Sequence, residues 1–161
     1  MNIFFKEHHE ILAALLKHRV NFMLIGGYAV NYYGYHRTTG DMDIWLEPSN
    51  ENKEMLLQAF TALGFDDEGI HTIRNWDFTK PQKFHIGSNS QPDKTDFLTH
   101  ISGVAFPNSF AQKTLADIDG FSLPVIHYNS LIQNKKSSGS TKDLADVEYL
   151  EKIILLKNKI K

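Results

Sequence analysis

The sequence has 161 residues, which is enough for one domain with its own hydrophobic core. The absence of cysteine excludes a disulfide scaffold, a thiolate zinc site, an iron–sulfur cluster and a cysteine nucleophile. With 17 Lys and Arg residues against 19 Asp and Glu residues, the net charge of −2 is not the strongly basic balance of a protein that grips duplex nucleic acid mainly by charge.

Hydrophobic periodicity predicts alternating helices and strands along the chain. Helices are expected at residues 7–18, 28–33, 50–63, 130–136 and 142–157. Strands are expected at residues 22–25, 42–46, 70–78 (with a bend), 83–86, 95–99, 113–118 and 121–126. The dipeptide Asp119-Gly120 predicts a tight hairpin turn between the last two strands. This order indicates a mixed α/β (α+β) architecture.

The sequence does not predict a membrane or secreted protein. Charged residues at Lys6 and Glu7 interrupt any apolar signal core at the N-terminus. The longest nonpolar stretch, residues 22–30, is too short to span a bilayer. We therefore expect a cytoplasmic protein that does not contact a membrane, with one domain over residues 1–161 and a helical tail from about residue 130 to residue 161.

The pair Asp41 and Asp43 stands at the head of an apolar strand. Side chains alternate along a strand, so both carboxylates point to one face while Met42 and Ile44 point to the core. Two carboxylates on one face repel each other, and a divalent cation such as Mg²⁺ compensates this repulsion and keeps positions open for phosphate. The alternative interpretation is a solvated strand edge, because a single Asp-x-Asp is a common pattern.

Gly26 and Gly27 lie between an apolar strand and a predicted helix, upstream of the Asp pair. Glycines at such a place let backbone N–H groups approach a phosphate, and the helix N-terminus favours the anion. The segment matches neither the Walker A loop nor the dinucleotide-binding turn. A tight strand-to-helix turn without a ligand remains the alternative.

The order strand, Gly-Gly, thirteen residues, Asp-x-Asp, strand resembles the nucleotidyltransferases of the DNA polymerase β superfamily. The matching segments are residues 24–28 and 41–44, together with the Arg-Thr-Thr-Gly approach at 37–40. Residues 131–136 and 142–148 resemble the C-terminal part of small stand-alone bacterial members, found among toxin–antitoxin and abortive-infection-type proteins. The likeness extends from about residue 10 to residue 150.

The resemblance implies a polymerase β-like nucleotidyltransferase fold, a mixed sheet flanked by helices. It also implies a third carboxylate on a neighbouring strand, for which Asp96 is the candidate and Asp93 the competitor. Asp41, Asp43 and Asp96 would then be the catalytic residues and would hold two Mg²⁺ or Mn²⁺ ions, as in two-metal nucleotidyl transfer. Gly26 and Gly27 would cradle the phosphates of the NTP.

Basic residues near these motifs are candidates for nucleotide binding. They are Arg37, Lys135, Lys136 and Lys142. For each lysine, a solvated helix end is the alternative interpretation.

The implied function is transfer of an NMP from an NTP such as ATP to a hydroxyl acceptor. The acceptor stays open between RNA, a protein and a small molecule, because the sequence contains no separate helical domain of the kind that larger polymerase-like enzymes use to hold it. The alternative is a non-catalytic, antitoxin-like binding partner of another protein that keeps the same fold. A third hypothesis is a phosphohydrolase built on the same carboxylates.

Overall fold

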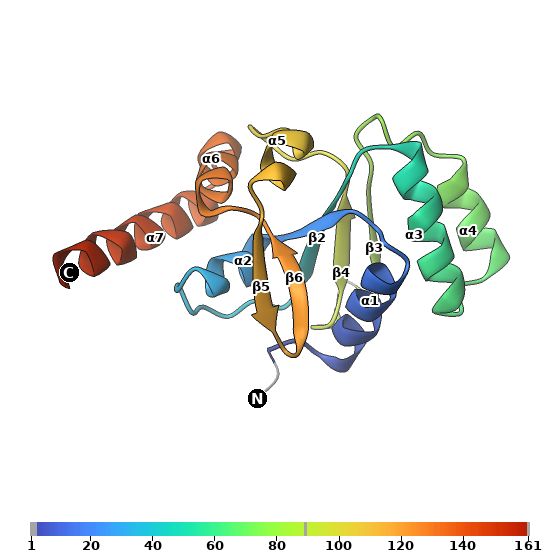
Figure 1. Ribbon diagram of the computed structural model, residues 1–161, viewed down its shortest axis with the longest axis horizontal. Coiled ribbons are helices and arrows are strands. Elements are labelled where there is room, and N and C mark those ends of the chain that lie inside the picture. Colours follow the sequence, from blue (N-terminus) through green and yellow to red (C-terminus); the bar gives the residue numbers. More distant parts are fainter. Residues whose placement is uncertain (1–2, 89, 161) are drawn as a thin grey trace.

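The computed structural model describes residues 3–88 and 90–160 of the chain (Figure 1). Its helices are α1 (Lys6–Lys17), α2 (Gly26–Tyr32), α3 (Asn50–Ala62), α4 (Asp67–Arg74), α5 (Phe106–Ala111), α6 (Tyr128–Ser138) and α7 (Thr141–Ile160). Its strands are β1 (Phe22–Ile25), β2 (Met42–Leu46), β3 (Lys83–Ile86), β4 (Thr95–Leu98), β5 (Thr114–Ile118) and β6 (Phe121–Val125).

The strands form a six-stranded sheet in the order β3-β4-β2-β1-β6-β5. Neighbours β3–β4, β1–β2 and β5–β6 are antiparallel, whereas β2–β4 and β1–β6 are parallel. The turn between β5 and β6 is the predicted one, since Asp119 and Gly120 both have positive φ angles, 52° and 84°. The prediction of a mixed sheet flanked by helices is confirmed.

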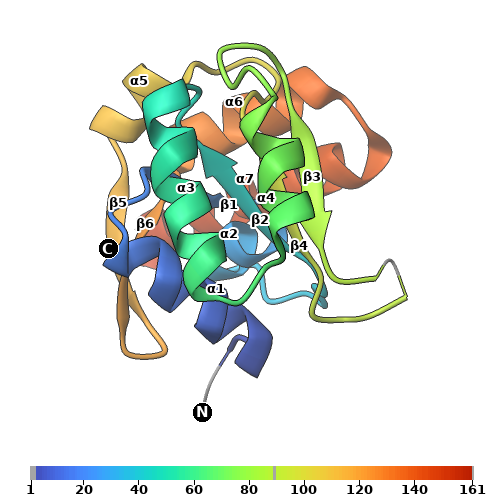
Figure 2. The same cartoon turned by 90° about the vertical axis from the view of Figure 1, so that its right-hand side faces the viewer.

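Helices α1, α3 and α4 cover one face of this sheet (Figure 2). Phe60 of α3 packs edge-on against Phe97 of β4, with 5.5 Å between the ring centroids. Ile44 lies beside Phe97 in the β2–β4 register, so Ile44 and Met42 point into this apolar layer, and both are fully buried. The alternating residues of β2, including Asp43, therefore face the opposite side.

That opposite side of β2 is closed at one end by an aromatic contact. Trp45 is buried, and its ring meets Phe106 of α5 edge-on at 5.2 Å between centroids. Its indole Nε1 donates a hydrogen bond of 3.0 Å to the carbonyl oxygen of Thr99. Because Trp45 is covered in this way, this end of the strand is closed to ligands.

The expected strand at residues 70–78 is wrong, because α4 occupies most of this segment. The side chain of Asp66 caps the helix by accepting a hydrogen bond of 2.8 Å from the amide of Gly69. At the other end, the buried ammonium of Lys53 donates to the carbonyl oxygens of Arg74 and Trp76, both at 2.7 Å. A cation at a helix C-terminus is favourable, so the helix is stabilised from both ends.

Two further differences concern the remaining helices. The short helix α5 lies in a segment without a predicted element, and α2 begins at Gly26 rather than at residue 28. Helix α7 runs outward from the sheet (Figure 1). In residues 3–88 and 90–160, no helix combines the length and apolar character that crossing a membrane requires.

Candidate active site

Three carboxylates meet where β2 and β4 run side by side, and we call Asp41, Asp43 and Asp96 the carboxylate triad. Asp43 and Asp96 are direct neighbours in the parallel β2–β4 register. Asp41 precedes β2 by one residue and shares the face of Asp43 by strand alternation. The competing candidate, Asp93, lies before β4 and is not paired with β2. The structure thus brings together the three acidic residues that the sequence analysis selected.

The environment of Asp43 disfavours its charged form. Burial, followed by the negative charges of Asp96 and Asp41, raises the pKa of Asp43 to about 7. Lys83 and Lys135 oppose this increase in the pKa of Asp43 by their positive charges. An uncompensated Asp43 carboxylate therefore costs folding free energy at neutral pH, and a cation beside it would recover that free energy.

A lysine already compensates the other two carboxylates. The Nζ atom of Lys94 lies 3.3 Å from Asp41 Oδ2 and 3.4 Å from Asp96 Oδ1. The Lys94 side chain is 14% exposed and that of Asp96 12%, whereas that of Asp41 is 44% exposed. Desolvation lowers the pKa of Lys94, but the two carboxylates outweigh it and raise the pKa above that of a free lysine. Lys94 is thus a cation in contact with the triad.

Gly26 allows Asp43 to approach the backbone where β1 passes into α2. Its φ angle is +67°, and Ile25 just before it is the register neighbour of Asp43. A Cβ atom at Gly26 would stand 2.9 Å from Asp43 Cγ and closer still to Asp43 Oδ2. A Cβ at Gly27 would stand 2.8 Å from Thr39 Cβ. Both glycines are therefore required by close packing around the triad.

Two clefts meet at Asp43. The larger, of about 610 Å³, is lined by Ile25, Gly26, Asp43, Lys83, Leu98, His100, Ile101, Ser102, Asn134, Lys135, Ser138 and Asp143. The smaller, of about 220 Å³, is lined by Gly27, Arg37, Thr38, Thr39, Gly40, Asp41, Asp43 and Lys142. Asp96 lines neither cleft but is the register neighbour of Asp43, which lines both. The site therefore has room for separate groups on two sides of one carboxylate.

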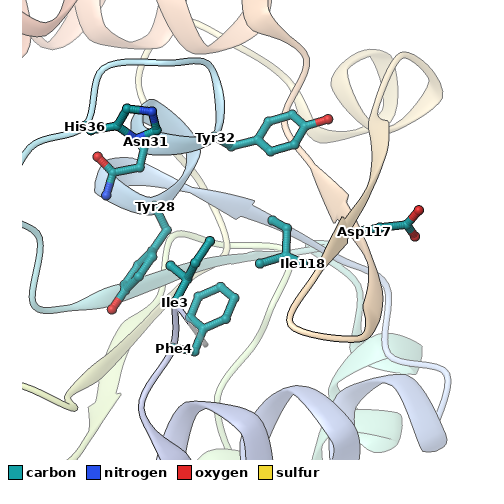
Figure 3. A pocket seen from close by; sticks show the side chains of 8 residues that line it. All are labelled: Ile3, Phe4, Tyr28, Asn31, Tyr32, His36, Asp117 and Ile118. Atoms are coloured by element: carbon teal, nitrogen blue, oxygen red, sulfur yellow. The ribbon is translucent and has the colours of Figure 1, made fainter. Parts of the chain in front are cut away.

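A third pocket lies apart from these clefts and shares no lining residue with them. It has a volume of about 300 Å³ and is lined by the N-terminal segment, α2, His36 and β5. Figure 3 shows the Tyr28, Phe4 and Ile3 side chains close together in this pocket. Its lining is mostly apolar and contains none of the triad, so we assign it no part in the chemistry of the carboxylates.

The structure places the four basic residues that were predicted to bind nucleotide either at the two clefts or away from them. Arg37 and Lys135 share the carboxylate of Asp146, which is 2% exposed: Arg37 Nε lies 2.9 Å from Oδ1 and Lys135 Nζ lies 3.0 Å from Oδ2. Lys142 lines the smaller cleft. Lys136 forms an exposed ion pair with Glu151 and lines neither cleft. The structure therefore brings three of the four candidates to the site.

The sequence analysis missed Lys94 and Asp146. Lys94 stands two residues before Asp96, so strand alternation alone would have placed the two side chains on one face. Asp146 gave no comparable signal, because its partner Arg37 is 109 residues away in the chain. Lys135 Nζ also lies 2.8 Å from Asp143 Oδ1, which completes a buried ionic cluster where α6 and α7 meet the loop before β2.

The triad has the donor chemistry of a site for a hard divalent cation. Carboxylate oxygens are the protein ligands that Mg²⁺ prefers, and burial together with the charges of Asp96 and Asp41 raises the pKa of Asp43. The ammonium of Lys94 stands in for a cation between two of the oxygens. Within the part of the chain that the structure describes, however, no three acidic or histidine side chains are already gathered closely enough to hold a metal ion.

Comparison with known proteins identifies the fold. Neither protein-family models nor curated proteins match the sequence. Among solved structures, the lincomycin-bound lincosamide antibiotic adenylyltransferase LnuA is similar, with a TM-score of 0.57 and 15% identity over 94% of this chain and 98% of that chain. The antibiotic-resistance factor ANT(2'')-Ia is similar with a TM-score of 0.55 and 13% identity, over 92% of this chain and 82% of that chain.

At these identities the likeness concerns the fold, which is a polymerase β-like nucleotidyltransferase fold. The sequence-based prediction of this fold is confirmed. No comparison bears on the toxin–antitoxin or abortive-infection subtype, which stays a prediction.

The close approach at Gly26 predicts an asymmetric response to alanine. Gly26→Ala and Gly120→Ala both place an L-residue at positive φ, which costs about 1–2 kcal/mol. Only Gly26→Ala also forces Asp43 to move, for an additional loss of about 1–3 kcal/mol, since nothing lies within 4 Å of a Cβ at Gly120. Urea unfolding measures both free energies, and equal losses would contradict the close approach.

The raised pKa of Asp43 predicts that Asp43→Asn stabilises the metal-free protein. Because the pKa rises from 3.8 to about 7 on folding, ionisation of Asp43 lowers the free energy of unfolding as the pH increases through that range. The gain in Asp43→Asn should reach its full value above pH 7, with an upper limit of about 4 kcal/mol, and vanish near pH 4. Thermal unfolding in EDTA at both pH values checks this. A variant less stable than the native protein at pH 8 would refute it.

The shared ion pairs predict that Asp146→Asn is strongly destabilising. The change leaves Arg37 and Lys135 without the carboxylate that both contact. Removing one partner of a buried ion pair costs about 3 kcal/mol. Urea unfolding should show this loss, while Asp117→Asn, at an exposed position of β5, should change stability by less than about 0.5 kcal/mol. Similar small effects in the two variants would show that the cluster at Asp146 does not hold the helices.

Proposed function

We propose that this protein transfers a nucleoside monophosphate from an NTP to a hydroxyl acceptor, with Asp41, Asp43 and Asp96 as catalytic residues. One observation carries the proposal. Asp43 and Asp96 are neighbours on paired parallel strands and Asp43 packs against Gly26, within a fold that is similar to two antibiotic-modifying proteins. This arrangement combines a phosphate-approaching backbone with concentrated negative charge, which nucleotidyl transfer requires.

The triad fits a divalent cation by its oxygen donors, and Asp41, Asp43 and Asp96 would hold Mg²⁺ or Mn²⁺. When bound, such cations supply the positive charge that offsets the charge of the phosphates. Asp43 lines both clefts, so it stands between the groups that would occupy them.

The smaller cleft suits the phosphates of the NTP. Arg37 and Lys142 give it positive charge, and Gly27 leaves its backbone accessible. Because Asp146 holds the Arg37 guanidinium through Nε and Nη2, the Arg37 side chain is fixed beside the cleft before any ligand arrives. A fixed cation loses little conformational entropy when an anion binds, which favours recognition of phosphate.

The larger cleft suits the nucleoside and the acceptor. The acceptor hydroxyl oxygen forms a bond to the α-phosphorus, the bond from that phosphorus to the bridging oxygen breaks, and pyrophosphate leaves. Asp96, beside Asp43, is the carboxylate proposed to take the hydroxyl proton. The reaction therefore needs two substrates that meet at Asp43, as the two clefts do.

Among the acceptors left open by the sequence, a small molecule is the first to test. The lincosamide antibiotic adenylyltransferase LnuA is similar over 98% of its own length. Its structure holds lincomycin, a small molecule. The same class of acceptor would fit a cleft of about 610 Å³.

A non-catalytic binding protein with this fold is the second candidate. One observation favours it: Lys94 already contacts two carboxylates of the triad. In that case the protein would bind a nucleotide or a protein partner without turnover, and replacing Asp43 would leave its binding unchanged.

Nucleotide binding gives the first test, because it needs no knowledge of the acceptor. In the native protein, an NTP with Mg²⁺ at 100 times its Kd should add about 2.7 kcal/mol of stability. In Asp43→Asn the increment caused by the ligand should be lost, whatever the starting Tm of the variant. Thermal unfolding with each NTP measures both increments. An increment that persists in Asp43→Asn would favour a nucleotide-binding protein without turnover, and the absence of an increment with every NTP would favour a binding partner of another protein.

Transfer itself is tested with NTP labelled at the α- or the γ-phosphate, incubated with small hydroxyl compounds. The α-label should enter the acceptor and the γ-label should appear in pyrophosphate. Release of inorganic phosphate without labelling of any acceptor would instead identify a phosphohydrolase.

A further inference from the structure

Lys94 occupies a position where a cation is held by two members of the triad. It lies immediately before β4, and its carbonyl oxygen accepts a hydrogen bond of 3.0 Å from the amide of Met42, the first residue of β2. This bond ties the Lys94 backbone to the start of β2, next to Asp41. Strand alternation directs its side chain to the face of Asp96, where Nζ contacts both carboxylates at 3.3 and 3.4 Å.

These contacts use oxygens that a divalent cation would also use. An ammonium and a divalent cation repel each other. The same pair of carboxylates therefore binds the two together more weakly than it binds either one alone. The side chain of Lys94 is only 14% exposed, so solvent screens this repulsion weakly. Binding of a cation to Asp41 and Asp96 therefore requires Lys94 to leave.

The structure also explains why Lys94 does not neutralise the whole triad. Its ion pairs reach Asp41 and Asp96, whereas the positive charges that act on Asp43 come from Lys83 and Lys135. Because one ammonium stands against three carboxylates, the triad still attracts positive charge. The contact thus weakens cation binding without abolishing it.

We propose that Lys94 is an internal counter-ion that competes with the divalent cation for Asp41 and Asp96. The displaced ammonium has a new partner when the phosphates of a nucleotide are bound, so nucleotide and cation bind together more tightly than either does alone. The proposal rests on the proposed function, because it assumes that the triad binds a divalent cation.

The test is the affinity of the protein for Mn²⁺ alone, measured from the electron paramagnetic resonance signal of the free ion. Lys94→Met should bind Mn²⁺ about tenfold more tightly than the native protein. The matched control is Lys157→Met, which removes the same charge from an exposed residue near the end of α7 that lines neither cleft and has no ion pair among the described contacts. Its affinity should change by less than about threefold, because an exposed charge is screened by salt.

Equal Mn²⁺ affinities in Lys94→Met and Lys157→Met would overturn the competition and leave the proposed function intact. If native protein, Lys94→Met and Lys157→Met all fail to bind Mn²⁺, the cation site itself is refuted, and the proposed function falls with the inference. Binding that persists when Asp41→Asn and Asp96→Asn are combined would place the ion away from the carboxylates that Lys94 contacts and would also refute both.

A second measurement does not depend on the folding of Lys94→Met. In native protein with ¹³C-labelled lysine ε-carbons, the Lys94 signal is identified by its absence in Lys94→Arg. Saturating Mg²⁺ should shift this signal toward that of a mobile lysine while the Lys157 signal moves little. An unchanged Lys94 signal with Mg²⁺ bound would overturn the proposal.

Discussion

The site depends on one electrostatic constraint, the crowding of the carboxylate triad at one end of two adjacent strands. Burial, together with the direct pairing of Asp43 with Asp96, raises the pKa of Asp43 to about 7. Positive charge favours the carboxylates of the triad: Lys83 and Lys135 supply it to Asp43, and Lys94 supplies it to the other two carboxylates. The remaining negative charge is what makes the site suitable for cations.

A second consequence of charge is the attachment of the C-terminal helices. The buried carboxylate of Asp146 in α7 holds Arg37 from the loop before β2 and Lys135 from α6. This cluster places α6 and the start of α7 at the open face of the sheet, where they border both clefts. Helices α6 and α7 are therefore part of the site. The buried ion pairs of Asp146 fix the position of the basic residues, which do not simply lie on an exposed surface.

Most elements were predictable because their signals are local. The alternation of Met42 and Ile44 with acidic residues predicted β2 and its orientation, and the Asp119-Gly120 turn predicted the last hairpin. Helix α4 was mistaken for a strand because β-branched and aromatic residues are frequent in that segment. Its capping by Lys53, from a different helix, is a tertiary contact that overrides this local preference.

By itself, the sequence determined that Asp41 and Asp43 share a face beside a Gly-Gly turn, because strand alternation needs only neighbouring residues. It also supplied the resemblance that led to the fold. Only the tertiary structure decided that Asp96 rather than Asp93 joins them, that Lys94 contacts two of the three carboxylates, and that Asp146 holds Arg37. The physical reason is that parallel pairing of β2 with β4 and the docking of α7 bring together residues far apart in the chain, which no local pattern encodes.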